Sequence, residues 1–318
     1  MIYLAPIRGV TDHIYRTLFE RHFGTFDFLV TPFITTVKGK DISARHVRDI
    51  SGEHNDRLRC IPQIIGNDPD DFVRCVGHMH VLGYSTVNWN LGCPHPQITR
   101  KQRGCGLLPF PERIDRFLAS VLSRIPCTLS VKVRLGLDNE YELERLMEIF
   151  NNYPLQEVIV HPRTGKQMYA GSVNSERFLA AAALCNHRVV YNGDIDTLDI
   201  FHQGERQFAQ INRWMIGRGM VRNPFLLQSI REDRTVERDY VVLRQFHDAV
   251  FQANSRILYG PAHLLGKMKE LWFYFCHNFD NGKKLLKTIQ RCTTIDRYLQ
   301  TVDRLFSQKK GPGFFPGP

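Results

Sequence analysis

Residues 87–96 read VNWNLGCPHP, a run in which apolar and polar side chains alternate until Gly92, Cys93 and Pro94 interrupt it. Such alternation is typical of a β-strand, and the glycine and proline predict that the strand opens into a loop at Cys93. A thiol at this place can be an acid, a nucleophile or a metal ligand, or simply a small buried hydrophobic residue. The rest of the sequence has to separate these roles.

Seven further short runs share the β-branched and aromatic character of residues 86–90. Amphipathic segments such as 111–124 and 140–151 lie between them. Strands that alternate with helices predict a parallel sheet, and eight such units in about 220 residues match a (β/α)8 TIM barrel. The seven runs are residues 2–6, 26–30, 61–65, 128–133, 157–161, 188–192 and 213–217.

Nearly every predicted strand ends in a residue that can bind a ligand or take part in chemistry. In a barrel the carboxyl ends of all strands meet at one mouth, so residues far apart in the sequence become neighbours. A doubly wound sheet would gather them less completely, which favours the barrel. The strand-end residues are Gln63, Asn88, Asn90, Lys132, Arg134, His161, Asn192, Gly217 and Arg218.

The β-rich runs stop near residue 235, and four segments that follow read as helices. We therefore expect an α/β chain with a TIM-barrel catalytic domain over 1–235 and a small all-helical domain over 236–310. The glycine- and proline-rich end over 311–318 predicts a flexible tail. The four predicted helices are 238–257, 261–278, 283–291 and 293–307.

Composition indicates which partners to expect. The chain has 42 Lys and Arg against 32 Asp and Glu, which gives a formal net charge of +10 and a pI of about 9.3. This excess favours a polyanionic partner, RNA or DNA first, although it can also serve solubility alone. The sequence has no run of eighteen apolar residues and no signal-peptide pattern. We therefore expect a soluble, cytoplasmic monomer with no membrane contact.

The cysteines predict neither disulfides nor a metal site. None of them forms a C-x-x-C pair, and a chain of this length without an export signal has little need of disulfides. Most are expected to be small buried hydrophobic residues, and zinc is disfavoured because no ligands lie at short spacing. The eight are Cys60, Cys75, Cys93, Cys105, Cys127, Cys185, Cys276 and Cys292.

The turn MIGRGM at 215–220 predicts a phosphate site at the end of the last strand, formed by the backbone at Gly217 and the Arg218 guanidinium. An ordinary βα turn would also explain these residues. The stretch YNGDI at 191–195 adds a second glycine turn one strand earlier. Neither a dinucleotide fingerprint after an early strand nor a Walker motif is present, so a tightly held mononucleotide is expected.

Flavin mononucleotide (FMN) fits this expectation. Lys132 would place positive charge near the N1 and C2=O side of the ring, and Gln63 would bond its pyrimidine edge. A buried lysine needs a partner or an electron-rich ring to offset its desolvation. The alternative is that Lys132 extends to water.

These motifs together resemble the bacterial dihydrouridine synthases, flavoenzymes that reduce uridine to dihydrouridine in tRNA, and the C-like subfamily is one candidate within them. The basic helical part, with Lys267 and Lys269 in GKMKELW, resembles the family's RNA-binding domain. The stretches that match, in the family's order, are LAPIRGVTD at 4–12, PQIIGN at 62–67, VNWNLGCP at 87–94, GCGLL at 104–108, VKVRLG at 131–136, VHPRT at 160–164, NGDI at 192–195 and IGRG at 216–219.

The resemblance implies a role for Cys93. In the family, hydride passes from NADPH through FMN N5 to C6 of uridine, and the cysteine at this position protonates C5. A thiol with an ordinary pKa near 8.5 is still protonated at neutral pH, so it can act as the general acid. Cys105 is the competing thiol of the same loop, but its flanking glycines favour a structural role.

The resemblance also assigns the other positions. Asn90 and Arg134 would face the substrate base, Arg163 would contact RNA phosphate or base, and Lys267 and Lys269 would bind RNA. The residues that would hold FMN are Pro6, Ile7, Arg8, Gln63, Lys132, His161, Asn192, Gly193, Asp194, Gly217 and Arg218.

The chain departs from the family pattern at several positions. Ile7 and Arg8 stand where the family commonly has Met and a small or acidic residue, Pro162 stands where Gly is usual, and Gln97 replaces a common Lys. These changes leave hydride transfer credible but bear on which uridine or which RNA is the target. Two rival functions remain: an FMN barrel oxidoreductase for a small molecule, and a barrel that binds RNA without catalysis.

Overall fold

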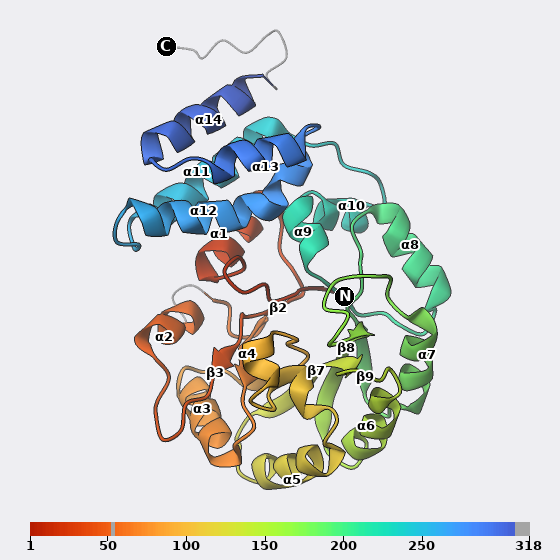
Figure 1. Cartoon of the computed structure of the whole chain (residues 1–318). Coiled ribbons are helices and arrows are strands. Elements are labelled where there is room, and N and C mark those ends of the chain that lie inside the picture. Colours follow the sequence, from red (N-terminus) through yellow and green to blue (C-terminus); the bar gives the residue numbers. More distant parts are fainter. Residues whose placement is uncertain (52–54, 309–318) are drawn as a thin grey trace. The chain divides into compact units, whose positions relative to one another are not determined.

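The computed structural model describes residues 1–51 and 55–308, and its strands form one parallel sheet (Figure 1). The predicted tail at 311–318 lies outside the described residues. The strands are β1 (Ile2–Leu4), β2 (Phe28–Val30), β3 (Ile34–Thr35), β4 (Cys60–Ile61), β5 (Gln63–Ile65), β6 (Thr86–Leu91), β7 (Thr128–Gly136), β8 (Leu155–Thr164), β9 (Arg188–Tyr191) and β10 (Trp214–Ile216).

The strand pairing closes this sheet into a barrel. β1 pairs in parallel with both β2 and β10, and the ladder continues from β10 through β9, β8, β7 and β6 to β5. β4 pairs with β2, and only Pro62 separates β4 from β5. Because β2 and β3 are likewise two pieces of one strand, the ten described strands fill eight barrel positions. This confirms the predicted (β/α)8 barrel.

The interior of the barrel is filled by side chains from six strands. Tyr3, Val30, Ile61, Ile159 and Met215 belong to one buried cluster, and none of them is more than 4% exposed. Outside the sheet, Trp89 of β6 stacks on Phe117 with ring centroids 4.0 Å apart. Alternate residues of each strand therefore supply the inner core and the outer helix-facing layer.

Helices flank the strands on the outside of the barrel, as α3, α5, α6 and α7 show in Figure 1. Two of them, α5 and α6, lie within the amphipathic segments 111–124 and 140–151 that the sequence predicts as helices. The helices of this part are α2 (Ala44–Ile50), α3 (Pro69–Val81), α4 (Pro96–Thr99), α5 (Pro111–Leu122), α6 (Glu142–Phe150), α7 (Ser175–Leu184), α8 (Leu198–Gln207) and the 3₁₀ turn η1 (Gly104–Leu107).

One strand is longer than its sequence predicts. The apolar run 157–161 suggests that the sixth strand ends at His161, but β8 continues through Pro162 to Thr164. The register between β7 and β8 shifts between the pairs Arg134–His161 and Gly136–Thr164. Proline is tolerated in a sheet at such an irregularity, where a ladder donor is already missing. The extension moves Arg163 onto the sheet.

The chain forms two compact units, and the second is helical. The first contains Met1–Arg8, Phe26–Ile195 and His202–Gly217; the second contains Gly9–Thr25, Asp196–Phe201 and the chain from Arg218 onward. Its helices are α1 (His13–Phe23), α9 (Arg218–Arg222), α10 (Leu226–Glu232), α11 (Tyr240–Ser255), α12 (Pro261–Phe275), the 3₁₀ turn η2 (Cys276–Asn278), α13 (Gly282–Gln290) and α14 (Ile295–Ser307).

The second unit also includes segments that precede residue 235. α1 belongs with the C-terminal helices because Phe23 lies against Phe225 and Phe246, with ring centroids 5.2 and 5.1 Å apart. This contact joins segments more than two hundred residues apart, and a helical pattern does not show which partner a helix will pack against.

A buried polar network lies inside the helical unit. His247 is fully buried and lies between Asp248, 2.8 Å from Nδ1, and the hydroxyl of Tyr298, 2.6 Å from Nε2. The indole of Trp272 donates to the same hydroxyl at 2.8 Å, which leaves the hydroxyl proton for Nε2. His247 is therefore neutral, with its proton on Nδ1. Burial lowers its pKa below 6.5, although Asp248 acts in the opposite direction.

Among the described residues, no helix combines the length and the apolar character that crossing a membrane requires. Within the same residues, no group of three or more His, Cys, Asp or Glu side chains is arranged to hold a metal ion.

The His247 network predicts acid sensitivity. A histidine whose pKa is lowered by folding contributes stability above about pH 6.5 that is lost as the pH falls toward its folded pKa. We expect the melting temperature of the protein to fall by a few degrees between about pH 7.5 and 5, and His247→Gln to flatten this dependence. His263→Gln, at an exposed position of α12, is the control. Equal slopes for the protein and His247→Gln would contradict this role.

Candidate active site

Parallel pairing places the predicted site residues side by side at the carboxyl ends of the central strands. Asn90 of β6 lies opposite Lys132 of β7, and Arg134 of β7 lies opposite His161 of β8. Gln63 of β5 lies opposite Asn88 of β6. Polar residues from four successive strands therefore gather at one end of the barrel.

The backbone of Cys93 is held on both sides. The carboxamide oxygen of Asn90 accepts the N–H groups of Gly92 and Cys93 at 3.0 and 2.9 Å. The backbone N–H and the thiol of Cys105 both lie against the carbonyl of Cys93, at 3.2 and 3.3 Å. A Cβ on Gly104, whose φ is +56°, would lie 2.6 Å from the same carbonyl, so this approach requires glycine. The loop therefore has little freedom at Cys93.

The two thiols of this loop differ in exposure and role. Cys93 is partly exposed and Cys105 is fully buried. Burial raises the pKa of Cys93, while the backbone N–H of His95 and the charge of Arg134 lower it less strongly. Burial raises the pKa of Cys105 to about 12. Cys93 is thus an accessible thiol that keeps its proton at neutral pH, and the position of Cys105 agrees with the structural role predicted for it.

Lys132 lies close to Cys93 at the barrel mouth. Within the part of the chain that the structure describes, no group accepts a hydrogen bond from its Nζ. Burial, and then the charge of Arg134, lower its pKa to about 7. A partly buried ammonium without a counterion is stabilised by an anionic or electron-rich ligand, so this arrangement fits the flavin ring that the sequence predicts.

Gln63, Asn90 and Arg134 make most of their contacts inside the barrel. Gln63 is 0% exposed, and its oxygen accepts from Asn90 Nδ2 at 2.7 Å. Arg134 is 2% exposed and donates to the carbonyls of Gly92 and Thr164 at 2.9 and 2.8 Å. These side chains therefore hold the loop and the strand ends in addition to any role toward flavin or substrate.

Arg163 forms a buried ion pair. It is 1% exposed, its two terminal nitrogens bind the carboxylate of Asp194, and Nη2 donates to the carbonyl of Gly171 at 2.7 Å. Nη1 also lies 3.2 Å from Nε2 of His161. Because arginine only donates, His161 accepts there and carries its proton on Nδ1. An RNA contact by Arg163, as the sequence predicts, would require it to leave these partners.

The two glycine turns lie at neighbouring strand ends. Asn192 Nδ2 donates to the carbonyl of Met215 at 2.7 Å, which ties the end of β9 to β10. A Cβ on Gly193 would lie 2.0 Å from the Tyr191 hydroxyl, so only glycine fits there. A Cβ on Gly217 would lie 3.1 Å from that of Ala5, just before the predicted flavin contacts Pro6, Ile7 and Arg8. Arg218 follows as the first residue of α9.

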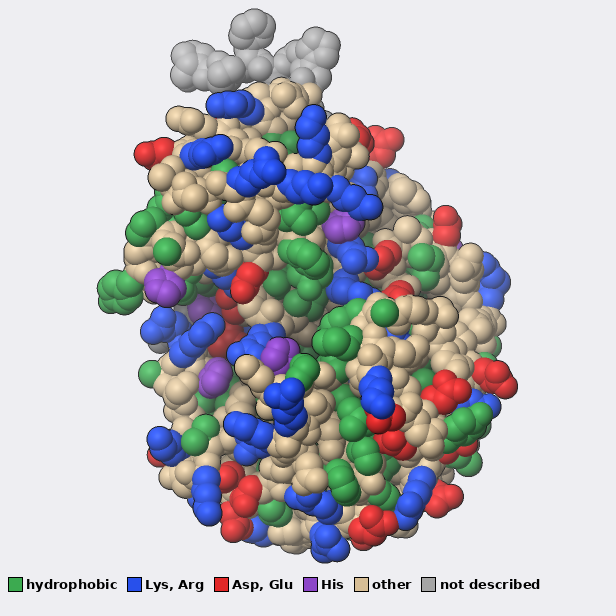
Figure 2. All heavy atoms as spheres, viewed as in Figure 1, with side chains coloured by type: hydrophobic (Ala, Val, Ile, Leu, Met, Phe, Trp, Pro, Cys, Tyr) green, Lys and Arg blue, Asp and Glu red, His purple; other side chains and the backbone are tan. Residues whose placement is uncertain are grey.

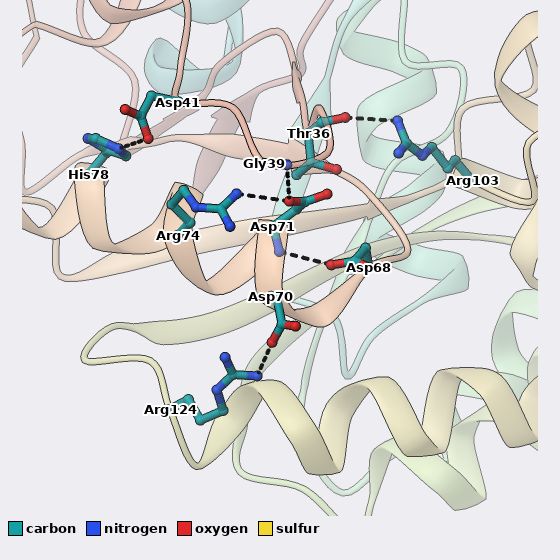
Figure 3. A network of polar contacts seen from close by, with 10 residues as sticks. All are labelled: Thr36, Gly39, Asp41, Asp68, Asp70, Asp71, Arg74, His78, Arg103 and Arg124. Carbon is teal, nitrogen blue, oxygen red and sulfur yellow. Dashed lines mark hydrogen bonds and ion pairs between the residues drawn. The ribbon is translucent and has the colours of Figure 1, made fainter.

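The basic stretch 99–104 is tied to the strand ends through Arg103. Its guanidinium donates to the carbonyl of Thr36 at 3.0 Å and to Asn67 Oδ1 at 3.1 Å. Figure 3 shows the contact with Thr36 beside Asp71, which accepts from Gly39 N and Arg74. The Arg103 guanidinium is therefore engaged by partners within the protein, whereas Arg100 and Lys101 are exposed.

The two lysines predicted to bind RNA also have internal partners. Within the helical unit, Lys267 Nζ donates to the carbonyl of Gly9 at 2.7 Å and pairs with Asp12 at 2.5 Å. Lys269 Nζ donates to the carbonyl of Cys292 at 2.7 Å. Their ammonium groups stabilise loop carbonyls, so both are weaker candidates for phosphate contacts than the sequence suggests.

Sequence reasoning missed two residues of this region. Tyr169 follows β8, with its ring 6.2 Å from that of His161 and 5.4 Å from the Arg134 guanidinium. Ser130 accepts a hydrogen bond from Asn88 inside the barrel. The signal for Ser130 is its position two residues before Lys132, which places both side chains on one face of the strand. No sequence pattern marks Tyr169.

Comparison with known proteins identifies the family. The sequence model of the family described as dihydrouridine synthase (Dus) matches residues 3–310. The chain belongs to the dihydrouridine synthase family. This makes it a flavin-dependent oxidoreductase and confirms the family that the motifs predicted.

Curated relatives agree with this assignment. The chain is 27% identical over 303 residues to the tRNA-dihydrouridine(16) synthase of Cupriavidus necator, in an alignment that covers 91% of this chain and 92% of that protein. It is 26% identical over 249 residues to tRNA-dihydrouridine synthase B of Pasteurella multocida, with 76% and 71% covered.

Solved structures support the fold. The histamine dehydrogenase of Rhizobium sp. 4-9 superposes with a TM-score of 0.55 at 12% identity over 73% of this chain, which spans 46% of that longer protein. An old yellow enzyme homologue from Zymomonas mobilis gives a TM-score of 0.54 at 10% identity, with 75% and 90% covered. At these identities the comparison shows the barrel architecture alone.

The unpartnered Lys132 predicts an effect on the bound flavin. Its ammonium favours the more negative reduced form, so Lys132→Met should lower the reduction potential by about 30–60 mV, a tenfold to hundredfold change for a two-electron couple. Redox titration of the purified protein measures this. Lys166→Met is the control, because Lys166 is exposed and pairs with Asp138. An unchanged potential in Lys132→Met would place the ammonium away from the flavin.

Proposed function

We propose that this protein reduces the C5–C6 double bond of a uridine in tRNA to 5,6-dihydrouridine, with FMN as its flavin and NADPH as the reductant. When bound, FMN would supply the hydride that adds to C6. The observation that carries the proposal is the pairing of an accessible, protonated Cys93 with an unpartnered Lys132 at one barrel mouth. Family membership and the names of the curated relatives support the tRNA substrate.

Cys93 would deliver the proton that completes the reduction. Hydride addition to C6 leaves the electron pair of the former double bond at C5, conjugated with the C4 carbonyl. Protonation of C5 by the Cys93 thiol restores a neutral base and leaves a thiolate, which solvent reprotonates. Burial helps this step, because it raises the pKa of Cys93 and keeps the thiol protonated until the substrate needs it.

The other residues of the mouth would bind and orient. We propose that Lys132, His161, Asn192, Gly193, Gly217 and Arg218 hold FMN, together with Pro6, Ile7 and Arg8 from the first strand end. Asp194 would act through Arg163, which orients His161. Gln63 and Asn90 would fix the Cys93 loop, with Asn90 and Arg134 beside the substrate base. One chain supplies all of these residues, so the reaction would not require a second subunit.

The C-terminal helices would bind the RNA. Lys283, Lys284 and Lys287 of α13 are exposed, and among the described residues no group pairs with their ammonium groups. Figure 2 shows a group of Lys and Arg side chains on the face of the molecule that includes this helix. We propose residues 1–235 as the catalytic part and 236–310 as the RNA-binding part, acting where tRNA occurs, in the cytoplasm.

Replacement of Cys93 tests the proposed cofactor and the proposed general acid together. Cys93→Ala should retain FMN, identified by the mass of the released cofactor, and should be reduced by NADPH at a nearly normal rate. Reoxidation by tRNA should slow by about 10²–10⁴-fold, the range for loss of a positioned general acid.

Cys105→Ala is the matched control for this experiment. It removes a thiol from the same loop but keeps the backbone N–H that supports Cys93, so a smaller loss is expected. A normal rate in Cys93→Ala, together with an abolished rate in Cys105→Ala, would mean that Cys105 and not Cys93 supplies the proton. Release of FAD instead of FMN would contradict the proposed cofactor.

Replacement of the α13 lysines tests the proposed RNA-binding surface. Replacing Lys283, Lys284 and Lys287 by Gln should weaken binding to all RNA sequences alike and flatten the salt dependence by about one unit for each phosphate that is no longer neutralised. Lys269→Gln removes the same charge from the neighbouring helix, where the ammonium has a protein partner, and should change the slope less. If the α13 variants bind normally at every salt concentration, the RNA surface lies elsewhere, with Arg100 and Lys101 as the next candidates.

A further inference from the structure

A chain of five hydrogen bonds runs from the backbone of Cys93 into the barrel wall. Cys93 N donates to Asn90 Oδ1 at 2.9 Å, Asn90 Nδ2 to Gln63 Oε1 at 2.7 Å, and Gln63 Nε2 to Asn88 Oδ1 at 2.7 Å. Asn88 Nδ2 then donates to Ser130 Oγ at 2.8 Å, and Ser130 Oγ to the carbonyl of Val87 at 3.3 Å.

Every member of the chain donates in the same direction. A backbone N–H begins it and a backbone carbonyl ends it, so neither terminus can exchange donor for acceptor. Each amide orientation is therefore set by the next, and a flip of one carboxamide would place two donors or two acceptors against each other. Hydrogen bonds aligned in this way also polarise and strengthen one another.

The chain is shielded from water, so its members cannot replace a missing partner. Gln63, Asn88 and Ser130 are 0% exposed, and Asn90 is 7% exposed. Removal of one hydroxyl at its far end leaves the Asn88 amide without an acceptor, and the amide has to turn to find another. That rotation breaks the alignment with Gln63 and Asn90, and through them with Cys93.

We propose that Ser130 and Asn88 are positioning residues for Cys93. They lie in the barrel wall and act through Gln63 and Asn90 to fix the loop from which the thiol projects. The inference rests on the proposed role of Cys93 as the general acid, since a fixed thiol matters only if its proton must reach one carbon. It also explains why Gln63 and Asn90, which the sequence predicts to contact flavin and substrate, form their side-chain hydrogen bonds within the protein.

Thr128 provides a matched control on the same strand. It lies two residues before Ser130 on β7, and its hydroxyl also bonds across the sheet, to Thr86 Oγ1 at 2.9 Å. The same hydroxyl lies 3.2 Å from the carbonyl of Ser85 and 2.8 Å from Gln156 Oε1, and Thr128 is exposed to solvent. Thr86 also precedes Asn88 by two residues on β6. No bond of the chain reaches Thr128, so Thr128→Ala removes a comparable cross-strand contact without touching the connection to Cys93.

The first measurement is the reactivity of Cys93 in the full-length protein, as alkylation by iodoacetamide followed by mass on the Cys93 peptide. We expect Ser130→Ala to loosen the loop, expose the thiol and shift its alkylation profile to lower pH. At pH 8 the rate should rise by about threefold to tenfold, as a larger thiolate fraction implies. Thr128→Ala should leave the rate within about twofold, and Cys185, which is also partly exposed, reports on general loosening in each variant.

The second measurement separates positioning from binding. Ser130→Ala should lower kcat for uridine reduction in tRNA by about tenfold to hundredfold, the loss expected for a displacement near 1 Å, while KM changes little. Ser130→Thr restores a hydroxyl and should recover most of the rate. If Ser130→Ala does not fold, Ser130→Cys keeps the volume but accepts hydrogen bonds weakly, and it should show the same losses.

The outcomes distinguish this inference from the function on which it rests. Unchanged Cys93 alkylation and kcat in Ser130→Ala, with only a lower melting temperature, would show that the series of hydrogen bonds serves stability alone. That result would overturn the inference. Equal shifts in Ser130→Ala and Thr128→Ala would do the same. Altered alkylation of Cys93 without any loss of kcat would instead mean that Cys93 is not the acid, which contradicts the proposed function.

Discussion

Parallel pairing between the first and the last strand, β1 and β10, determines the barrel and with it the position of every strand end. It joins Ile2–Leu4 to Trp214–Ile216 and closes a ladder in which all strands run in one direction. Because all strands run the same way, every carboxyl end opens at one mouth. Cys93, Lys132, His161 and Asn192 are spread over about a hundred residues of sequence, and the parallel pairing of β6 with β7, β7 with β8 and β8 with β9 brings them to that mouth.

Closure of the barrel also shields the polar groups at the strand ends from water. Because a buried polar group without a hydrogen bond is destabilising, each of them needs a partner inside the protein. The amides of Gln63, Asn88 and Asn90 satisfy one another, Arg163 pairs with Asp194, and Cys105 supports the carbonyl of Cys93. Lys132 stands apart because its ammonium has no such partner among the described residues. The same shielding that rigidifies its neighbours makes it the group best placed to receive a ligand.

The barrel could be predicted from the sequence because each strand carries a local signal, and the same signals mark the residues proposed for the site. Alternating apolar residues mark each strand, and a polar residue directly after a strand must lie at the barrel mouth. Long-range contacts have no such local signal. Nothing local to His13–Phe23 shows that α1 packs with the C-terminal helices, and the charges of Lys267 and Lys269 do not reveal the carbonyls that they bind. Likewise, Arg163 follows a predicted strand end, but β8 continues past Pro162 and buries it.

In the proposed reaction, a uridine in tRNA receives a hydride at C6 and a proton at C5 in this barrel. The most direct test is a single turnover in D₂O: the NADPH-reduced protein is mixed with unmodified tRNA, and the nucleosides are analysed by mass spectrometry and NMR. We expect one dihydrouridine for each flavin reoxidised, with solvent deuterium at C5. Reoxidation of the flavin without dihydrouridine, or deuterium-free C5 in the product, would contradict it.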